Sequence, residues 1–357
     1  MKSRRIGLIT SWPLSFAEGS GTATYVRAWM AAMRARGYEV RLFGYRSPFR
    51  HYGLQLLDRV RWNRWALPRQ IASARPDRLV ALDWEGLFLD RPAEVQLPLA
   101  IFADIAPTEP GLYRWALRWQ ARMEARALQR APVVVAISRF ARERISRRYG
   151  RPEARIELIY PGFDHEAWLA LLRAQTRRPR QIPEVLAVAR LYPRKGIRYL
   201  LEAGAELNRR AVSWRATIVG DGQEAQALRA LAERLGLQAQ LRWAGAVEDR
   251  AHLAYYYRNA DVFCHPSLHE TFGFVLLEAM AAGLPVVAAQ AASMPELVEE
   301  GRTGLLVAPA QPQALADGLE RLLRDPERRR LLGEAAQERA RGFSWQTTAA
   351  AFEALLA

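Results

Sequence analysis

Two glutamates, Glu270 and Glu278, offer the clearest chemistry in this sequence. Glu270 stands in a polar loop behind a short apolar strand predicted at 261–264. Glu278 stands one turn inside the apolar helix predicted at 274–282. A carboxylate within an apolar helix is costly to bury unless a partner hydrogen-bonds to it, and the hydroxyl pair of a ribose is such a partner. The simpler alternative is a solvated helix face and a surface loop charge.

The predicted start of that helix is a candidate anion site. The amides of Phe272, Gly273 and Phe274 stand where backbone N–H groups have no partner within the helix. Gly273 has no side chain to cover them. Because the helix follows a strand of a predicted parallel sheet, we expect the site at the carboxyl edge of that sheet, where α/β proteins bind anionic ligands.

Two cations, Arg190 and Lys195, follow another strand, which is predicted at 185–189. Cations in that place can neutralise a departing diphosphate. The chain has only two lysines, Lys2 and Lys195, among many arginines, which indicates that a compact ammonium is needed at position 195. The alternative is that both cations are solvated surface charges.

The chain is long enough for two domains, because 357 residues of which 50% are hydrophobic can bury two cores. Strands and helices alternate along both halves, which predicts an α/β fold with doubly wound sheets. A charged, proline-bearing stretch at 165–182 is the predicted boundary. The strands of the first half are predicted at 5–10, 41–45, 78–82, 99–102, 133–137 and 156–160.

A glycine-rich loop is predicted between the first strand and the first helix, and it contains Gly19, Ser20 and Gly21. Such a loop lets backbone amides approach a phosphate or a sugar closely. Loops of this composition that bind nothing are also common, so the pattern alone does not decide between the two readings.

The formal net charge of +15 is concentrated in the first half of the chain, where residues 1–165 hold 28 Lys and Arg against 15 Asp and Glu. A domain with this excess favours an anionic partner, which is membrane lipid, nucleic acid or an acidic substrate.

A helix predicted at 110–130 has an unusual basic and aromatic surface. Its arginines are Arg114, Arg118, Arg122, Arg126 and Arg130, and its apolar stripe is Leu112, Trp115, Trp119, Met123 and Leu128. One interpretation is a solvated basic face on a helix packed by its Trp side. The other is a surface for anionic lipid head groups, with Trp62 and Trp65 nearby at the interface. Nucleic acid is the third option, although no recognition motif accompanies these residues.

The single cysteine, Cys264, excludes an internal disulfide and favours a reducing compartment. Its position in an apolar strand predicts a packed thiol rather than a nucleophile. No apolar run is long enough to span a bilayer, and the N-terminal apolar segment is too short for a signal peptide. We therefore expect a cytoplasmic protein, either free or peripheral at the inner face of the cell membrane.

From about residue 184 to 350 the chain resembles the retaining GT-B glycosyltransferases of family 4, which transfer sugars from nucleotide-sugar donors. The matching strings are VARLYPRKG, IVGDG, YRNADVFCHPSLHETFGFVLLEAMAAGLPVVA, PELVEEGRTGLLV and FSW. The first half is similar more loosely, through EGSGTATYVRAWMAAMRARGYEV, AISRF and IYPGFD. The resemblance implies two Rossmann-like domains, 1–167 and 180–342, facing across a cleft, with the last helix, 343–357, returning to the first domain.

The resemblance also assigns roles to residues. It implies that Glu278 binds the ribose hydroxyls and that Glu270 lies by the donor sugar, beside the amides of 272–274. Arg190 and Lys195 are expected to hold the diphosphate. The resemblance also implies that Ser20 and Gly21, in a loop of the first domain, and Gly220 of IVGDG contribute to donor binding.

The sequence departs from the family after its fourth predicted strand, where the family commonly has a histidine that contacts the donor sugar. This chain has Ala103 and Asp104 there, and Asp104 is expected to hydrogen-bond a sugar hydroxyl instead.

The implied function is a retaining hexosyltransferase with a hydroxyl acceptor, either a precursor of a membrane lipid or surface polysaccharide or a soluble sugar. No cofactor and no dedicated metal are expected, because two cations stand by the diphosphate and no Asp-x-Asp string occurs. The other hypothesis is a non-catalytic nucleotide or nucleic-acid binder with the same fold.

Overall fold

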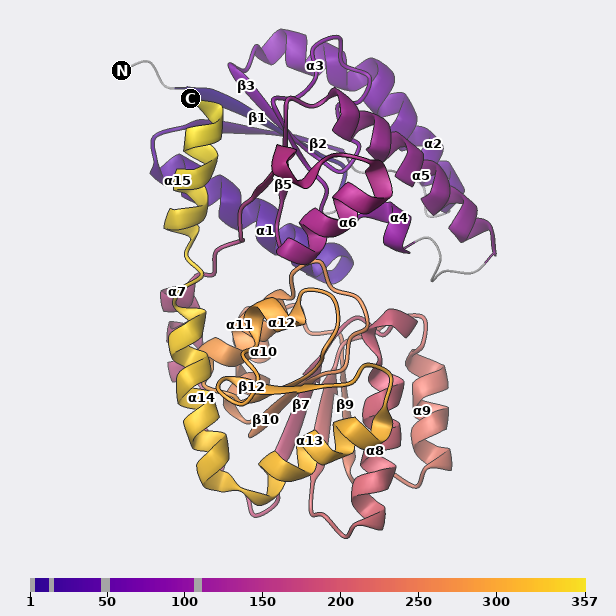
Figure 1. Ribbon diagram of the computed structural model, residues 1–357, viewed down its shortest axis with the longest axis vertical. Coiled ribbons are helices and arrows are strands. Elements are labelled where there is room, and N and C mark those ends of the chain that lie inside the picture. The colour runs from indigo at the N-terminus through magenta and orange to yellow at the C-terminus, as the bar shows by residue number, and fades with distance from the viewer. Residues whose placement is uncertain (1–3, 13–15, 46–51, 106–110) are drawn as a thin grey trace. The chain divides into compact units, whose positions relative to one another are not determined.

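The computed structural model describes residues 4–12, 16–45, 52–105 and 111–357 (Figure 1). The chain divides into two compact units. Unit 1 comprises Met1–Gly162 and Ser344–Ala357, and unit 2 comprises Phe163–Phe343.

Unit 1 is built on a six-stranded parallel sheet with the order β2-β1-β3-β4-β5-β6. Its strands are β1 Arg5–Thr10, β2 Glu39–Gly44, β3 Arg78–Leu82, β4 Val95–Leu97, β5 Val133–Ala136 and β6 Ile156–Leu158. Its helices are α1 Phe16–Ala35, α2 Tyr52–Arg61, a π-helical turn Trp62–Ala66, α3 Leu67–Ala74, α4 Phe102–Ile105, α5 Gly111–Arg130, α6 Arg139–Tyr149 and α15 Trp345–Leu356.

Unit 2 has a second six-stranded parallel sheet, with the order β12-β11-β10-β7-β8-β9. Its strands are β7 Glu184–Val188, β8 Arg215–Val219, β9 Leu241–Gly245, β10 Val262–His265, β11 Val286–Ala289 and β12 Gly304–Val307. Its helices are α7 His165–Arg173, α8 Ile197–Arg209, α9 Ala225–Arg234, α10 Arg250–Arg258, α11 Phe274–Ala281, α12 Met294–Leu297, α13 Pro312–Arg324 and α14 Pro326–Ala340.

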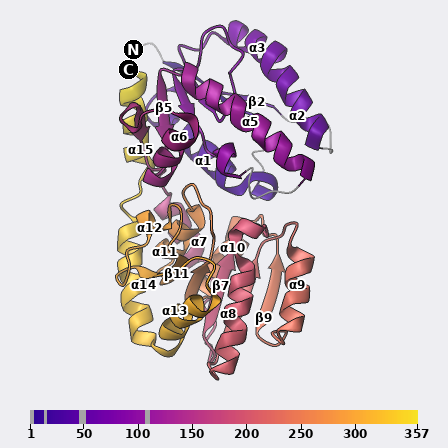
Figure 2. The same ribbon diagram turned by 45° about the vertical axis from the view of Figure 1, so that its right-hand side comes forward.

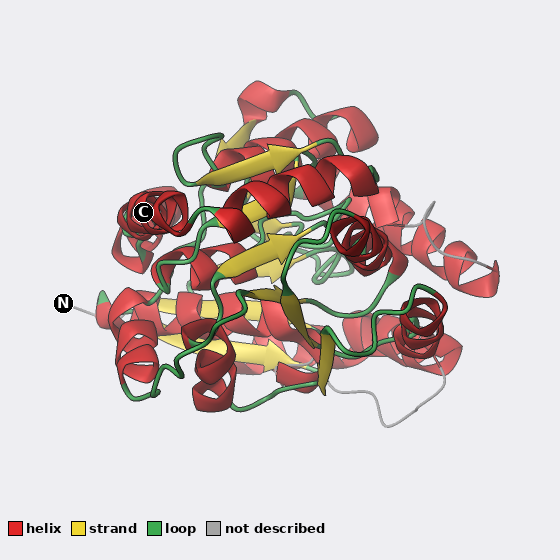
Figure 3. Ribbon diagram, turned by 90° about the horizontal axis from the view of Figure 1, so that it is seen from below, coloured by secondary structure: helices red, strands yellow, loops and turns green. Residues whose placement is uncertain are grey.

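Both sheets lie between helices (Figure 3). Their strands are near-continuous apolar runs, as expected of parallel strands covered on both faces. In unit 2, α8 packs against α13 and α9, and α11 packs against α14 (Figure 2). These observations confirm the prediction of two doubly wound α/β sheets.

The last helix, α15, packs against α1 inside unit 1, as predicted. Two edge-to-face ring pairs join them. Tyr25 meets Trp345 with 5.6 Å between ring centroids, and Trp29 meets Phe352 at 5.4 Å.

Residues 165–182, predicted as the boundary, begin with α7, which belongs to unit 2. Trp168 of α7 is buried, and its indole N–H donates to the carbonyl oxygen of Glu278 at 3.0 Å. Because this anchor ties α7 to α11, the division between the units falls earlier, between Gly162 and Phe163.

The fourth strand was predicted at 99–102, and this prediction is wrong. The strand is Val95–Leu97, and a helix follows at Phe102–Ile105. Pro98 has no N–H to continue the ladder. The next two amides, of Leu99 and Ala100, donate to the carboxylate of Asp83 at 2.8 and 3.0 Å instead of to a neighbouring strand.

The glycine-rich loop predicted at residues 19–21 is also wrong, because α1 begins at Phe16 and contains both Ser20 and Gly21. A glycine inside a helix costs only about 1 kcal/mol relative to alanine. The buried face of α1, with Tyr25 and Trp29, offsets that cost by tertiary packing.

Candidate functional site

The candidate site of unit 2 lies where its sheet reverses direction. The chain passes from β7 to β8 and β9 on one side, and then returns to place β10 on the other side of β7. In doubly wound sheets, ligands bind outside the carboxyl ends of the two strands at such a switch point. The loop after β7 carries Arg190 and Lys195, and the loop after β10 carries Glu270.

The two loops touch, and Gly196 allows it. Its φ of +68° is in the left-handed region, and a Cβ there would lie 2.1 Å from the carbonyl oxygen of Pro266. Across the same contact, the amide of Leu268 donates to the carbonyl oxygen of Arg194 at 2.8 Å. The loops are therefore held together by backbone, and no other residue type fits at position 196.

Lys195 and Glu270 form an ion pair at this contact, with Nζ against Oε1. Both side chains are largely covered, at 15% and 16% exposed. The sequence predicted both residues as site residues, and the structure brings them together.

The pKa of Glu270 reflects its neighbours. Burial by itself raises the pKa of the carboxyl, but the charge of Lys195 and the adjacent His265 outweigh burial and hold the pKa well below its usual range. His265 is buried, and its Nε2 lies 3.4 Å from Oε1 of Glu270. The sequence analysis missed His265, although its place at the end of β10, directly before the loop, was a usable signal.

Hydrogen bonds from Ser293 hold the loop from Glu270 to Gly273 in place. The buried Ser293 hydroxyl lies 3.0 Å from the carbonyl oxygens of both Glu270 and Phe272. Phe272 is buried, and Gly273, with φ of +95°, is the N-cap residue of α11 and makes no side-chain capping hydrogen bond. The start of α11 therefore has the uncapped geometry that the sequence predicted.

Glu278 is buried in α11 and already has two partners. Arg250 Nη1 donates to Oε1 at 2.6 Å, and the Tyr257 hydroxyl donates to Oε2 at 2.9 Å. The guanidinium of Arg250 also lies 4.6 Å from the ring of Trp168. Burial, and after it the charge of Glu278, raises the pKa of Tyr257 well above its usual value. The sequence analysis missed all three neighbours, which come from α10 and α7.

The other two donor-side predictions of unit 2 lie at the ends of neighbouring strands. Arg190 is exposed after β7, where its Nη2 donates to the Tyr192 hydroxyl at 2.6 Å. Gly220 follows β8, and a Cβ at its position would lie 1.8 Å from the carbonyl oxygen of Ala189. This close approach of β7 and β8 is a structural reason for glycine there.

The predicted residues of unit 1 are placed as follows. Asp104 is buried in α4, and its carboxylate accepts from Nε and Nη2 of Arg144, both at 2.6 Å, and from Nε of Arg148 at 2.8 Å. This geometry gives Asp104 a role in joining α4 to α6, and its role in sugar binding stays a prediction. Gly21 lies in α1, and a Cβ built there would meet nothing within 4 Å outside the neighbouring backbone of its own helix; Ser20 lies beside it in the same helix.

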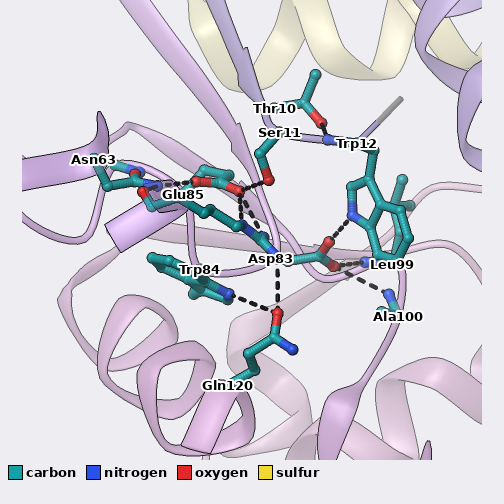
Figure 4. Close-up of polar contacts among 12 residues, drawn as sticks. Thr10, Ser11, Trp12, Asn63, Asp83, Trp84, Glu85, Leu99, Ala100 and Gln120 are labelled. Atoms are coloured by element: carbon teal, nitrogen blue, oxygen red, sulfur yellow. Dashed lines mark hydrogen bonds and ion pairs between the residues drawn. The ribbon is translucent and has the colours of Figure 1, made fainter. Parts of the chain in front are cut away.

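Unit 1 has its own switch point, between β1 and β3, and a buried polar network fills it (Figure 4). We call this the β1–β3 network; it consists of Ser11, Trp12, Arg59, Asn63, Asp83, Glu85 and Gln120. Glu85 accepts from Nε of Arg59 at 2.7 Å and also from Ser11 and Asn63. Asp83 accepts from the Trp12 indole as well as from the amides that end β4.

Burial is the main cause of the shifted pKa values of two carboxyl groups, Asp83 in this network and Glu124 near it. It raises the pKa of Asp83, against the opposing effect of the Trp12 hydrogen bond. It raises the pKa of Glu124 of α5 to about 8, and the nearby charge of Asp83 adds to that effect. Glu124 accepts from the amide of Phe102 at 2.9 Å and from the Tyr149 hydroxyl. We therefore expect Glu124 to be largely protonated at neutral pH.

Three further sequence predictions concern features away from the sheet edges. Cys264 is buried, and burial raises the pKa of its thiol, which confirms the packed thiol. Within the described ranges, no three His, Cys, Asp or Glu side chains are grouped as metal ligands. None of the described helices has the length and apolar composition needed to cross a membrane.

Comparison with known proteins gives a family for each half of the chain. Residues 19–167 match the model described as Glycosyltransferase Family 4, and residues 170–339 match the model described as Glycosyl transferases group 1. The chain superimposes on sucrose-phosphate synthase from Thermosynechococcus elongatus with a TM-score of 0.84 and 24% identity, over 99% of this chain and 98% of that one. This likeness shows the fold.

Two curated relatives differ in how much they cover. The D-inositol 3-phosphate glycosyltransferase of Corynebacterium glutamicum is 38% identical over 57% of this chain and 50% of its own length, so the chain spans about half of that relative. The GDP-mannose-dependent alpha-(1-6)-phosphatidylinositol monomannoside mannosyltransferase of Mycolicibacterium smegmatis is 32% identical over 81% of both chains. With this match and the two family models, the chain belongs to glycosyltransferase family 4, the glycosyl transferases of group 1.

Proposed function

We propose that this protein transfers a hexose from a nucleotide-diphosphate sugar to a hydroxyl acceptor. The observation that carries the proposal is the pair of Lys195 and Glu270 at the switch point of unit 2, beside the uncapped start of α11. An ammonium and helix amides attract a diphosphate, and a carboxylate accepts hydrogen bonds from sugar hydroxyls. A sugar diphosphate needs both kinds of group within reach.

The donor contacts follow from these positions. Arg190 and Lys195 hold the diphosphate together with the amides of 272–274, and Glu270 binds hydroxyls of the donor sugar. Glu278 binds the ribose: a carboxylate has about four acceptor positions, so Arg250 and Tyr257 leave room for two hydroxyls. Ser20 and Gly21, which lie in α1, stay our candidates from unit 1.

We propose that the reaction retains the anomeric configuration. The bond from the sugar's C1 to the diphosphate breaks while Lys195 and the helix amides stabilise the charge that develops on the leaving group. The acceptor oxygen forms its bond to C1 on the same face, and its proton passes to an oxygen of the departing diphosphate. Two cations at the leaving group serve in place of a dedicated metal ion.

The relatives' names suggest which substrates to test first. One acts on inositol 3-phosphate, and the other depends on GDP-mannose and acts on a phosphatidylinositol mannoside. We propose a polyhydroxylated acceptor of this kind, either lipid-linked or soluble, and a hexose donor carried by GDP or UDP.

The test begins with the purified full chain and a thermal-shift panel of GDP, UDP and ADP, followed by their hexose derivatives. We expect one nucleotide diphosphate to raise Tm and its sugar to be hydrolysed slowly without acceptor. The anomeric proton coupling of the transferred sugar, measured by NMR, reports whether the configuration is retained. If no nucleotide diphosphate binds and no donor is hydrolysed, the proposal is wrong and a non-catalytic role is favoured.

A second proposal concerns the partner of unit 1: we propose that α2 and α5 bind an anionic membrane surface at the inner face of the cell membrane. The exposed side chains that support it are Leu54, Leu57, Tyr113 and Trp115, together with Arg118, Arg122 and Arg126. Trp115 is 63% exposed, with Arg118 5.6 Å from its ring. Apolar and cationic side chains on one surface suit anionic head groups.

Two of the tryptophans expected at this surface are not exposed there. Trp62 is buried, and Trp119 packs edge-to-face on the buried Trp84 at 5.6 Å. Arg130 is also a structural residue, because its Nη2 donates to the carbonyl oxygen of Leu89 at 2.8 Å. The proposed surface is therefore smaller than the sequence predicted.

Co-sedimentation with vesicles tests the membrane proposal. We expect binding to vesicles with anionic lipid, no binding to neutral vesicles, and release at high salt because ionic screening weakens arginine contacts with head groups. Trp115→Ser should weaken binding, whereas Leu331→Ser, at an exposed apolar position of unit 2, should not. Equal behaviour of the two variants would favour a soluble acceptor.

A further inference from the structure

Unit 1 contains a cavity whose lining residues belong neither to the β1–β3 network nor to the side chains named for the membrane surface. It has a volume of about 520 Å³, within the range of small-molecule sites. We call it the lateral pocket; the lining residues used below are Tyr45, Asp58, Arg61, Trp62, Trp65 and Arg69. They come from the end of β2, which is an edge strand, and from the continuous helical segment formed by α2, the π-helical turn and α3.

The π-helical turn, Trp62–Ala66, places two indoles on the lateral pocket. Pro68 supplies a local reason for the turn, because it has no N–H for the carbonyl group four residues earlier. Trp62 is 5% exposed and stacks on Tyr45, with 5.4 Å between ring centroids. Trp65 also lines the pocket and is 51% exposed, so about half of its surface is open to a ligand.

Among the residues that the structure describes, the polar groups of the lateral pocket have no hydrogen-bond or ion-pair partner. The Tyr45 hydroxyl is buried and has no hydrogen bond to any described residue. The side chains of Asp58, Arg61 and Arg69 make no hydrogen bond or ion pair with any other described residue. Arg59, one residue from Asp58, by contrast donates from Nε to Glu85 and from Nη1 to Gln120. A buried hydroxyl without a partner is costly, so a ligand that hydrogen-bonds to the Tyr45 hydroxyl would remove that cost.

These groups select one ligand chemistry. An open indole packs against the apolar C–H face of a sugar ring. Two guanidinium groups bind a phosphate or a carboxylate, while Asp58 and the Tyr45 hydroxyl are suited to ring hydroxyls. A nucleobase is less suited, because Tyr45 stacks on Trp62 and leaves only one ring open for stacking.

We propose that the lateral pocket binds an acidic saccharide unit, a pyranose ring that carries a phosphate or a carboxylate. This site is separate from the donor site of unit 2, so it does not depend on the proposed transfer reaction. The anionic ring can be a free sugar phosphate or the acidic residue of a longer glycan, and these two sources share the same contacts.

Calorimetric titration of the full chain, without any nucleotide sugar, tests the proposal. The probes are glucose 6-phosphate, glucuronate, glucose, inorganic phosphate, AMP and a tetrasaccharide that contains glucuronate. We expect the two acidic sugars to bind at least about tenfold more tightly than glucose or phosphate alone, since each single group supplies one part of the contact. Tighter binding of the tetrasaccharide identifies a glycan as the source.

Matched variants assign the site. Arg61→Gln with Arg69→Gln, and separately Trp65→Ala, should each weaken the acidic sugars about tenfold or more. All three side chains are exposed, so these variants should keep the Tm of the parent. Arg147→Gln, at an exposed position of the same unit, should leave binding unchanged. Equal binding of AMP, or binding that the pocket variants do not change, would overturn the proposal.

Discussion

The carboxyl edges of the two sheets hold carboxylates that are largely or fully covered, in different electrostatic settings. At the switch point of unit 2, Glu270 faces Lys195 and His265, and its pKa is lowered. At the switch point of unit 1, Asp83 and Glu85 are fully buried and share Arg59 as their cation. There the pKa of Asp83 is raised.

The difference teaches that topology gives a site its position but not its chemistry. The pair in unit 2 is built from two long side chains that are still about one-sixth exposed, so a ligand can exchange with one of them. In the β1–β3 network the oxygens of Asp83 already accept from two backbone amides and an indole, so the same place in the fold serves to hold strands and loops together. Substitutions should therefore separate activity from stability between the two units.

The largest effect is expected for Lys195→Ala. Loss of the ammonium should slow donor cleavage by about a hundredfold or more, because a charge that stabilises the leaving group is removed. Initial rates of sugar release at saturating donor measure this. The control is Arg198→Ala, an exposed cation of α8 that pairs with Glu202. Unchanged turnover in Lys195→Ala would remove its role at the leaving group and weaken the contrast between the units.

Asp83→Asn should show the opposite profile. An amide nitrogen in place of one carboxylate oxygen faces donors, so at least one hydrogen bond to Trp12 or to the amides after β4 is lost. We expect unit 1 to lose about 2 kcal/mol of stability, measured as a lower urea midpoint, while donor hydrolysis persists. Asp90→Asn, an exposed control, should change neither quantity. A normal midpoint with lost activity would instead place Asp83 in the reaction.

Glu124→Gln should change how stability depends on pH. The pKa of Glu124 is raised from 4.5 to about 8, so its contribution to stability is fully present below about pH 4.5 and is lost as pH rises through 8. The variant keeps a neutral side chain and should flatten the decline between pH 5 and 8, by about 1 to 3 kcal/mol. Urea midpoints across pH measure this.

The contribution of Glu270 to stability changes with pH in the opposite direction. Its lowered pKa means that its contribution is present above the unfolded value and is lost as pH falls. Glu124→Gln should therefore leave the acid side of the profile unchanged. A parallel shift of the whole profile would contradict the assignment to Glu124.

The smallest effect is expected for Arg250→Met. The guanidinium holds Glu278 in place from α10, so we expect KM for the donor to rise about threefold to tenfold with little change in kcat. Steady-state kinetics with the full chain separate the two constants. Arg258→Met, at the exposed far end of α10, is the matched control. An equal fall in kcat would instead indicate that Arg250 contacts the transition state.

The pairing of Lys195 with Glu270 was predictable because both residues lie in segments that follow strands, and strand order decides which of these segments meet. The neighbours of Glu278 were not predictable in this way. Arg250 and Tyr257 lie on α10 and meet Glu278 only through the packing of one helix on another. The fourth strand was placed wrongly for a similar reason: the competing partner of its expected amides, Asp83, is far away in sequence.

The amine of Lys195 has a practical consequence. Because arginine supplies nearly every other cation, Lys2 is the only other side-chain amine, and it lies outside the described residues. Among the described residues, an acylating reagent therefore has a single side-chain amine to react with. The rate at which that amine is labelled, read by mass spectrometry, then reports occupancy of the donor site without a spectroscopic tag.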